Sequence, residues 1–342
     1  MRFFSGLHPI NRPAVPQADQ SGWTTQQPGG PFTKPLMLNL DTYSVPVYDA
    51  ATATGFLTLT QHPTYMSAIH FLTDSPANGP VIVQPDTRVV VPWSPAWFPA
   101  DSVGGDRILC IVDRATGRAW DLWICDWAWR FLWWHSTAIV AASVRRYDNL
   151  PTRPYVDGRI ISRGCGLEKL AGVLRVEELE EAVRTAGVVP HALSITIPNS
   201  RIGATYRKGC ATRNELSSLA VASMGGVVTK VRPDTETMPS GTRWRLDWSE
   251  QDITAHVLRY GLTPGQRDTV GAVIRTMTVF GVFAGESKGE TAIRCSIETD
   301  RSPATTTRWA QLGLTSEALT QPYQQCLAAI PASAWQVCEE IT

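Results

Sequence analysis

The 342-residue sequence lacks cysteine pairs with metal-ligand spacing, complete catalytic motifs and uninterrupted apolar runs of membrane-spanning length. None of its seven cysteines forms a CxxC pair, so we expect no zinc site and no other metal centre. There is no serine nucleophile elbow, no phosphate-cradling glycine loop and no HExxH helix, which excludes the reaction classes that those motifs serve. We therefore expect no cofactor.

An excess of charge of either sign is also missing. The 31 basic and 31 acidic residues cancel, which argues against a surface made for nucleic acid or for an anionic membrane. The N-terminal residues MRFFSGLHPINRP are broken by Gly, His and Pro, so we expect no secretory signal. The apolar run at 127–142 is interrupted by Arg130, His135 and Ser136 and is too polar to span a membrane. The sequence thus predicts no nucleic-acid or membrane partner, and a product that is soluble inside the cell that makes it.

Apolar and aromatic residues, by contrast, are plentiful. Hydrophobic residues make up 43% of the chain and charged residues 18%, which is typical of a globular protein with a sizeable core. The 13 tryptophans are far above ordinary usage. Their rings serve either as large core side chains or as stacking platforms for sugars and protein partners.

A β-hairpin is predicted at 105–123, GDRILCIVDRATGRAWDLW. An apolar strand leads into turn residues that begin at Asp113, and a second strand returns from Arg118. Because side chains alternate along a strand, Trp120 and Leu122 would share one face, with Asp121 and Trp123 on the other. We expect the first face to be core and the second to be available for binding.

The pattern of the whole chain predicts a mainly β protein: a β-sandwich (jelly-roll-like) core with two flanking helices and extended N- and C-terminal arms. Residues 1–35 are rich in proline and predict an extended arm that orders only by docking. Residues 36–78 predict a small β docking element, 79–300 the sandwich core and 301–342 a C-terminal arm.

Two helices are predicted from apolar residues at helical spacing. The first covers 175–186, with its glutamates (Glu177, Glu178, Glu180 and Glu181) on a solvent-exposed face. The second covers 263–280, where Thr263 caps the helix and Pro264 occupies its first position.

A glycan site needs flat aromatic faces bordered by carboxylates or other polar groups. The sequence offers four such residues: Trp93, Trp97, Asp106 and Trp123. The alternative for Trp93 and Trp97, which lie among prolines, is that they pin a loop to the edge of the β core.

Glycoside hydrolysis needs two facing carboxylates, and Asp121 with Glu168 is the best acid and base pair that the sequence offers. Asp113 at the turn is explained by local backbone hydrogen bonding. A lyase would instead use a base such as His191, with Arg107 to neutralise a sugar carboxylate. The alternative for His191, at the start of a strand, is a structural hydrogen bond to the backbone.

The hairpin at 105–123, the run GLEKLAGVLR at 166–175 and the strand that begins at His191 resemble, in that order, a bacterial family of mostly uncharacterised proteins. The similarity covers about residues 79–298, and it implies a β-sandwich like that of the secreted members. The family pattern has His where this chain has Ile108, an aromatic-Glu-Leu-aromatic unit at 120–123 and Ala-Asp-Asn-Gly at 284–287. A site that used that His or Asn would be altered here.

The proline-rich arm and the composition also resemble minor tail proteins of actinobacterial phages. This likeness implies a structural component of the virion tail or tail tip, in a homo- or hetero-oligomer with other tail proteins, with a β-sandwich that contacts host cell-envelope polysaccharide. We favour this non-enzymatic role, located in the virion after synthesis in the host cytoplasm. The alternative is a carbohydrate-active enzyme, a glycoside hydrolase or polysaccharide lyase of the bacterial cell envelope.

Overall fold

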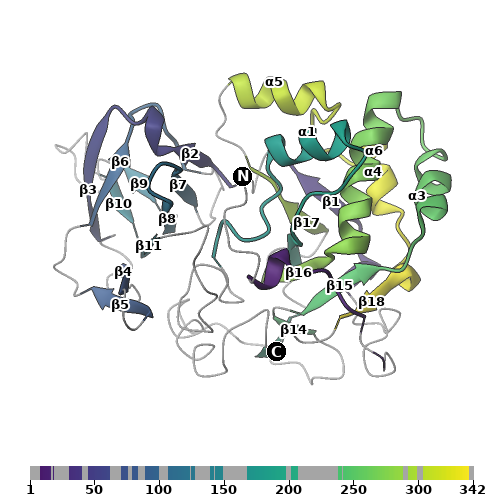
Figure 1. Cartoon of the computed structure of the whole chain (residues 1–342), viewed down its shortest axis with the longest axis horizontal. Coiled ribbons are helices and arrows are strands. Elements are labelled where there is room, and N and C mark those ends of the chain that lie inside the picture. The colour runs from purple at the N-terminus through teal and green to yellow at the C-terminus, as the bar shows by residue number, and fades with distance from the viewer. Residues whose placement is uncertain are drawn as a thin grey trace.

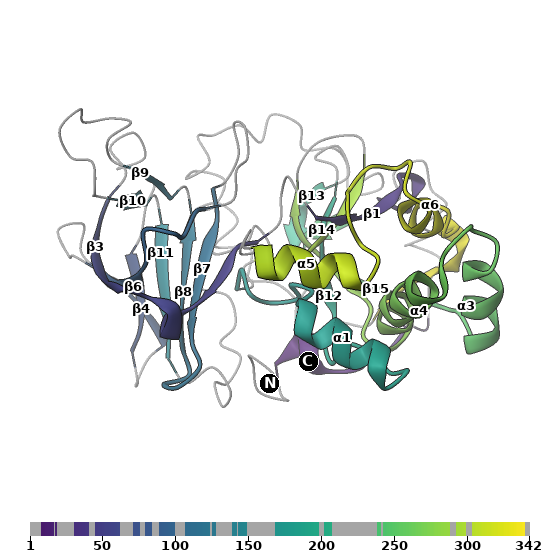
Figure 2. The same ribbon diagram turned by 90° about the horizontal axis from the view of Figure 1, so that it is seen from above.

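The computed structural model describes most of the chain in two lobes. Figures 1 and 2 show a β lobe (residues 45–148) beside an α/β lobe (residues 8–40 and 168–338) that contains the α-helices. The residues described are 8–16, 18, 31–40, 45–61, 71–75, 79–83, 89–99, 107–123, 125–127, 139–141, 143–148, 168–197, 202–206, 238–240, 242–287, 292–298 and 303–338. None of the helices in these ranges is long and apolar enough to cross a membrane.

The β lobe consists of two sheets. The larger has the strand order β2 (Val47–Asp49), β7 (Leu109–Asp113), β8 (Arg118–Trp123), β11 (Ser143–Tyr147), β4 (Phe71–Ser75) and β5 (Gly79–Val83). The smaller has the order β6 (Val89–Trp93), β3 (Gly55–Gln61), β10 (Ile139–Ala141) and β9 (Asp126–Trp127). Both sheets mix parallel and antiparallel pairs. In the larger sheet β2 runs parallel to β7 and β7 antiparallel to β8, and in the smaller sheet β3 runs parallel to β10 and antiparallel to β6.

The predicted hairpin is confirmed as β7 and β8, with Asp113 accepting backbone hydrogen bonds in the turn. Trp120 and Leu122 point into a buried apolar cluster that also holds Leu59 of β3 and Val91 of β6. The face of β8 that was expected to be core therefore packs against side chains of the second sheet.

The α/β lobe is built on one mixed sheet with the order β1 (Leu36–Asn39), β17 (Ile293–Ser296), β12 (Leu193–Ile197), β16 (Val282–Ser287), β15 (Arg243–Leu246) and β18 (Trp335–Val337). Its helices are α1 (Val176–Arg184), α3 (Glu250–Val257), α4 (Pro264–Val279), α5 (Pro303–Gln311) and α6 (Pro322–Ala328). A separate pair, β13 (Ile202–Tyr206) and β14 (Met238–Ser240), completes the strands described.

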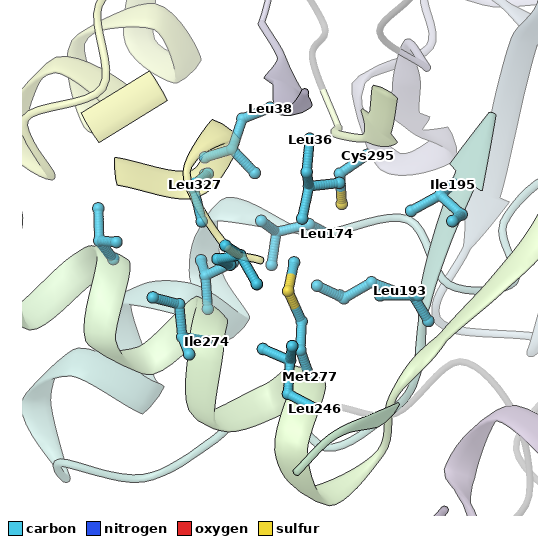
Figure 3. Packing of buried hydrophobic residues seen from close by; sticks show 14 of the residues in the cluster. Leu36, Leu38, Leu174, Leu193, Ile195, Leu246, Ile274, Met277, Cys295 and Leu327 are labelled. Atoms are coloured by element: carbon cyan, nitrogen blue, oxygen red, sulfur yellow. The ribbon is translucent and has the colours of Figure 1, made fainter. Parts of the chain in front are cut away.

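The core of this lobe lies between the sheet and the helices. Figure 3 shows Leu193 of β12 beside Met277 of α4. Ile195 of β12, Ile274 of α4 and Leu327 of α6 belong to the same cluster. All five side chains are fully buried. Burial of apolar surface stabilises the folded state by about 25 cal/mol per Å². This cluster is therefore the main source of the lobe's stability.

Local sequence signals explain where two of the helices begin. Thr263 caps α4 and Pro264 lies in its first turn, as the sequence predicted, and Gln266 completes a capping box with Thr263. Ser249 and Asp252 form a second capping box that starts α3, a helix that we did not predict. The fold is therefore more helical than the two flanking helices expected from the sequence.

The terminal segments are not arms, and this prediction is wrong for the residues that the structure describes. Ile10, Ala14 and Phe32 are buried, β1 pairs with β17, and Ala14 donates to the carbonyl of Val279. At the other end β18 pairs with β15, and Trp335 stacks on Phe32 with ring centroids 3.9 Å apart. Proline limits only local backbone geometry, so it did not prevent these segments from packing.

The domain boundaries predicted at 36–78 and 79–300 also differ from the structure. Strand β1 belongs to the α/β lobe, whereas β2, β3 and β4 belong to the β lobe. The predicted sandwich core is likewise divided, because β7 and β8 lie in one lobe and β12 and β16 in the other. Strand patterns mark single strands and do not identify the partners with which they pair.

We expect Trp335→Ala to lower the free energy of unfolding by about 3–5 kcal/mol, because it removes a buried ring that joins the two ends of the chain. Urea denaturation followed by fluorescence measures the change. Leu319→Ala, at a leucine that is 44% exposed, is the matched control and should have little effect. Equal stability of Trp335→Ala and the wild type would contradict the terminal packing.

Candidate functional site

The predicted catalytic residues gather where the two lobes meet. We call this contact the seam. It is the buried surface along residues 168–178, a segment that ends in the first turn of α1. Its apolar part joins side chains of both lobes, with Val47 and Cys110 from the β lobe, Phe283 from β16, and Leu170 and Val173 between them.

Gly172 shows how closely the seam is packed. Its φ is +70°, and a Cβ at this position would lie 2.6 Å from the ring of Phe283 and 2.7 Å from the backbone nitrogen of Ser194. Its carbonyl accepts a hydrogen bond from Ser194 at 2.7 Å. The backbone approach and the left-handed conformation both require glycine.

Asp121 lies in the seam with its carboxylate fully engaged. One oxygen accepts hydrogen bonds from the Tyr147 hydroxyl at 2.5 Å and from the Lys169 backbone nitrogen at 2.8 Å. The other accepts from the Cys110 thiol at 3.2 Å. Asp121 of β8 thus joins β7 and β11 of the β lobe to the start of the 168–178 segment.

Glu168 precedes Lys169, so the two carboxylates proposed as acid and base do meet in one region. Glu168 is buried, and its carboxylate contacts Nε2 of His8 at 3.2 Å. His8 comes from the N-terminal segment and is itself buried. The contact ties that segment to the seam, and neither carboxylate presents an exposed surface to a substrate.

The face of β8 that carries Asp121 and Trp123 is less open than expected: Asp121 is closed off and only part of Trp123 reaches solvent. Asp121 is 4% exposed and Trp123 is half-buried, because residues 168–178 and other side chains of the α/β lobe cover this side of the sheet. Alternation along one strand identifies the two faces but does not show that a second lobe will cover one of them.

A second group of charges, which we call the Arg175 cluster, lies at the start of α1. The buried guanidinium of Arg175 donates to Glu178 and, at 3.1 Å, to Glu177. Glu178 also contacts Nε2 of His191 at 2.9 Å. The prediction that Glu178 faces solvent is wrong, since it is 7% exposed and turned toward Arg175 and His191.

The electrostatics of the cluster keep Glu178 ionised. Burial alone would raise the pKa of Glu178, but the charge and hydrogen bond of His191, followed by those of Arg175, lower it to about 2. Nδ1 of His191 lies 2.9 Å from the carbonyl of Ala192. Both ring nitrogens of His191 therefore face acceptors, and neither is free to serve as a base. The contact with the Ala192 carbonyl is the structural hydrogen bond to the backbone that the sequence left open as the alternative.

The Arg175 cluster extends into the β lobe through Arg114, in the turn between β7 and β8. Arg114 lies 3.0 Å from Glu177 and 3.3 Å from Asp49, the last residue of β2. Both contacts are partly exposed, so each alone contributes little to stability. Together they continue a line of alternating charges from the β lobe to α1.

The predicted glycan-binding aromatic residues are mostly part of the β core. Trp97 stacks on Tyr48 with centroids 4.9 Å apart, and Trp93 meets Trp97 edge to face at 5.8 Å. Both tryptophans are buried, so they pin the loop after β6, the alternative that the sequence left open. Asp106 and His135 lie outside the described residues.

Sequence reasoning missed Arg175, Glu178, Tyr147 and Glu298, all of which are buried polar residues of the seam. Tyr147 and Glu298 carry no local signal. For Arg175 and Glu178, a signal was present in the sequence: a charged residue precedes a helix and another lies three positions later, where both can turn to the same side. We missed this signal because the spacing of the apolar residues placed Glu178 on the face expected to be exposed to solvent.

We expect Glu178→Gln to lower the free energy of unfolding by about 3 kcal/mol at pH 6–7, because it leaves Arg175 and His191 without their buried carboxylate. The folded pKa is below the ordinary value of 4.5, so this stabilisation is present above 4.5 and is lost as the pH falls toward 2. Urea titrations from pH 7 to pH 2.5 should show the two proteins converging. Glu250→Gln, at an exposed pair with Arg275, is the control, and a difference independent of pH would contradict the assignment.

Comparison of the chain with protein-family models, with curated proteins and with solved structures finds no match in any of the three. Within the described residues, no three His, Cys, Asp or Glu side chains are grouped so that they could hold a metal ion. The functional inference therefore rests on the seam and on the surface of the two lobes.

Proposed function

We propose that this chain is a structural protein of a phage virion, of the minor-tail or tail-tip class, and that it works in an oligomer with other tail proteins. The observation that carries the proposal is the seam, where Asp121, Glu168 and His191 are buried and bonded to other parts of the chain. Groups held in this way join the two lobes. The virion class itself comes from the resemblance to actinobacterial minor tail proteins.

An exposed apolar face of the β lobe supports an assembly role. Phe56 of β3 is 79% exposed and Val90 of β6 is 53% exposed. Val90 pairs with Thr58, two residues after Phe56, so the two side chains lie on the same face of the sheet. Exposed neighbouring apolar side chains are typical of surfaces that contact another protein.

The finer architecture is part of the same proposal. We propose that the β lobe is a β-sandwich of jelly-roll-like type. Support comes from its core, in which side chains of the sheet that contains β7 and β8 share one cluster with side chains of β3 and β6. Half-buried Trp123 is the one described aromatic residue of the predicted glycan set that is not fully buried, and we propose that host cell-envelope glycan is contacted near it.

The alternative function is a glycoside hydrolase or polysaccharide lyase of the cell envelope. The specific observation in its favour is that Asp121 and Glu168 lie in the same part of the seam, as an acid and base pair would. Incubation with cell-envelope polysaccharide or peptidoglycan tests it through released oligosaccharide. Release by the wild type that Asp121→Asn abolishes would establish the enzyme and overturn the structural role.

The structural role predicts that the chain is present in purified particles of the phage that encodes it, at the tail. Mass spectrometry of the particles and immunogold labelling measure this. The double variant Phe56→Ser and Val90→Ser should be incorporated several times less well because the apolar face is lost. Leu258→Ser, at a leucine of the other lobe that is 58% exposed, is the control. Absence of the wild-type chain from particles would contradict the proposal.

A further inference from the structure

Glu298 lies where three distant segments of the seam meet. Its backbone nitrogen donates to the carbonyl of Leu174 at 2.9 Å, and the adjacent Ile297 carbonyl accepts from Val45 at 2.8 Å. Val45 leads into β2 of the β lobe, and Leu174 leads into α1 of the α/β lobe. The position of Glu298 is thus coupled to the contact between the lobes.

The side chain of Glu298 is buried without a hydrogen bond for one of its oxygens. It is 8% exposed, and Oε2 has no hydrogen-bond partner among the described residues. A buried carboxylate in that situation is costly, whereas a protonated carboxyl group is tolerated far better. The geometry therefore favours the neutral acid in the closed structure.

The neighbouring acids act in the same direction, and the nearby arginines that oppose them are already paired. Glu177 and Glu178 of α1 already share the guanidinium of Arg175, and Glu178 is further paired with His191. The other cations that act on Glu298 are Arg114 of the β7–β8 turn and Arg308 of α5, which is itself paired with Glu180. Ionised Glu298 would be a third carboxylate competing for one buried guanidinium.

Burial is the largest cause that raises the pKa of Glu298, and Glu177 and Glu178 raise it further. Arg175 and Arg114 oppose them, and the result is a pKa of about 8 against an ordinary value of 4.5. Glu298 is therefore protonated at neutral pH in the closed seam. In an open seam, where water reaches the carboxyl group, it would be ionised.

We propose that Glu298 is a proton-operated latch of the seam: the protonated side chain closes the contact between residues 45–47, 174–178 and 297–298, and release of its proton to solvent opens it. Opening lets water solvate the carboxylate, while Arg175 keeps Glu177 and Glu178, which lie on its own segment. Opening is local: the core of the β lobe contains none of these residues, and in the core of the α/β lobe it involves Leu174, Val176 and Ile297 alone. This inference does not depend on the virion assignment.

The sign of the pH dependence follows from the two protonation states. Between pH 4.5 and about pH 8 the closed seam holds a proton that the open seam has lost, so closing requires proton uptake. The closing equilibrium should therefore fall about tenfold for each pH unit in that window. Above pH 8 both states are ionised, and the dependence should level off.

Hydrogen exchange of the full chain from pH 5 to pH 9, corrected for the intrinsic exchange rate, tests the latch. In the wild type, protection of amides at 45–47, 174–178 and 297–298 should fall about tenfold per pH unit up to about pH 8. In Glu298→Gln, which keeps the shape without the charge, protection of these amides should not depend on pH in this way. Glu181→Gln, at an exposed pair with Arg184, is the matched control and should behave as the wild type does.

Arg114→Gln provides a second variant, because Arg114 lowers the pKa of Glu298 from a partly exposed position. Without this cation the pH-dependent range should extend to higher pH. The latch is wrong if Glu298→Gln keeps the wild-type pH dependence. It is also wrong if protection is lost equally across all amides of both lobes, since the proton would then control global unfolding and not the seam.

Discussion

Arg175 carries a positive charge into a site almost closed to water, and the carboxylates around it make that burial tolerable. A buried guanidinium without partners would cost several kcal/mol. Glu178 and Glu177 supply the partners, while His191 and Arg114 connect them to β12 and to the β lobe. The apolar contacts of the seam bring the lobes together without strong directional preference, and this chain of charges fixes how they are oriented.

The same principle explains why residues with catalytic potential have structural positions here. Asp121 satisfies a tyrosine hydroxyl, a thiol and a backbone nitrogen in one place. Removing any polar group from a buried network leaves its partners unsatisfied, so such groups are constrained by their neighbours as strongly as an active-site residue is by its substrate. Residue type alone does not distinguish the two cases.

Local features of the fold could be predicted from the sequence. The turn at Asp113, the cap at Thr263 and the strand that returns from Arg118 each depend on a few consecutive residues, and each is found in the structure. Features that depend on distant segments could not. The pairing of β1 with β17, the cover over Asp121 and the inward turn of Glu178 are set by packing between the lobes, which no pattern of apolar spacing records.

Strand β1 has a consequence for how the protein is made. The β lobe uses one continuous stretch of chain, whereas the other sheet pairs Leu36–Asn39 with Ile293–Ser296 and ends on Trp335–Val337. During translation the β lobe is complete and free to fold while β1 has no partner. The second sheet closes only after Trp335–Val337 has left the ribosome, so until then the apolar residues of β1 must be shielded from aggregation by other means.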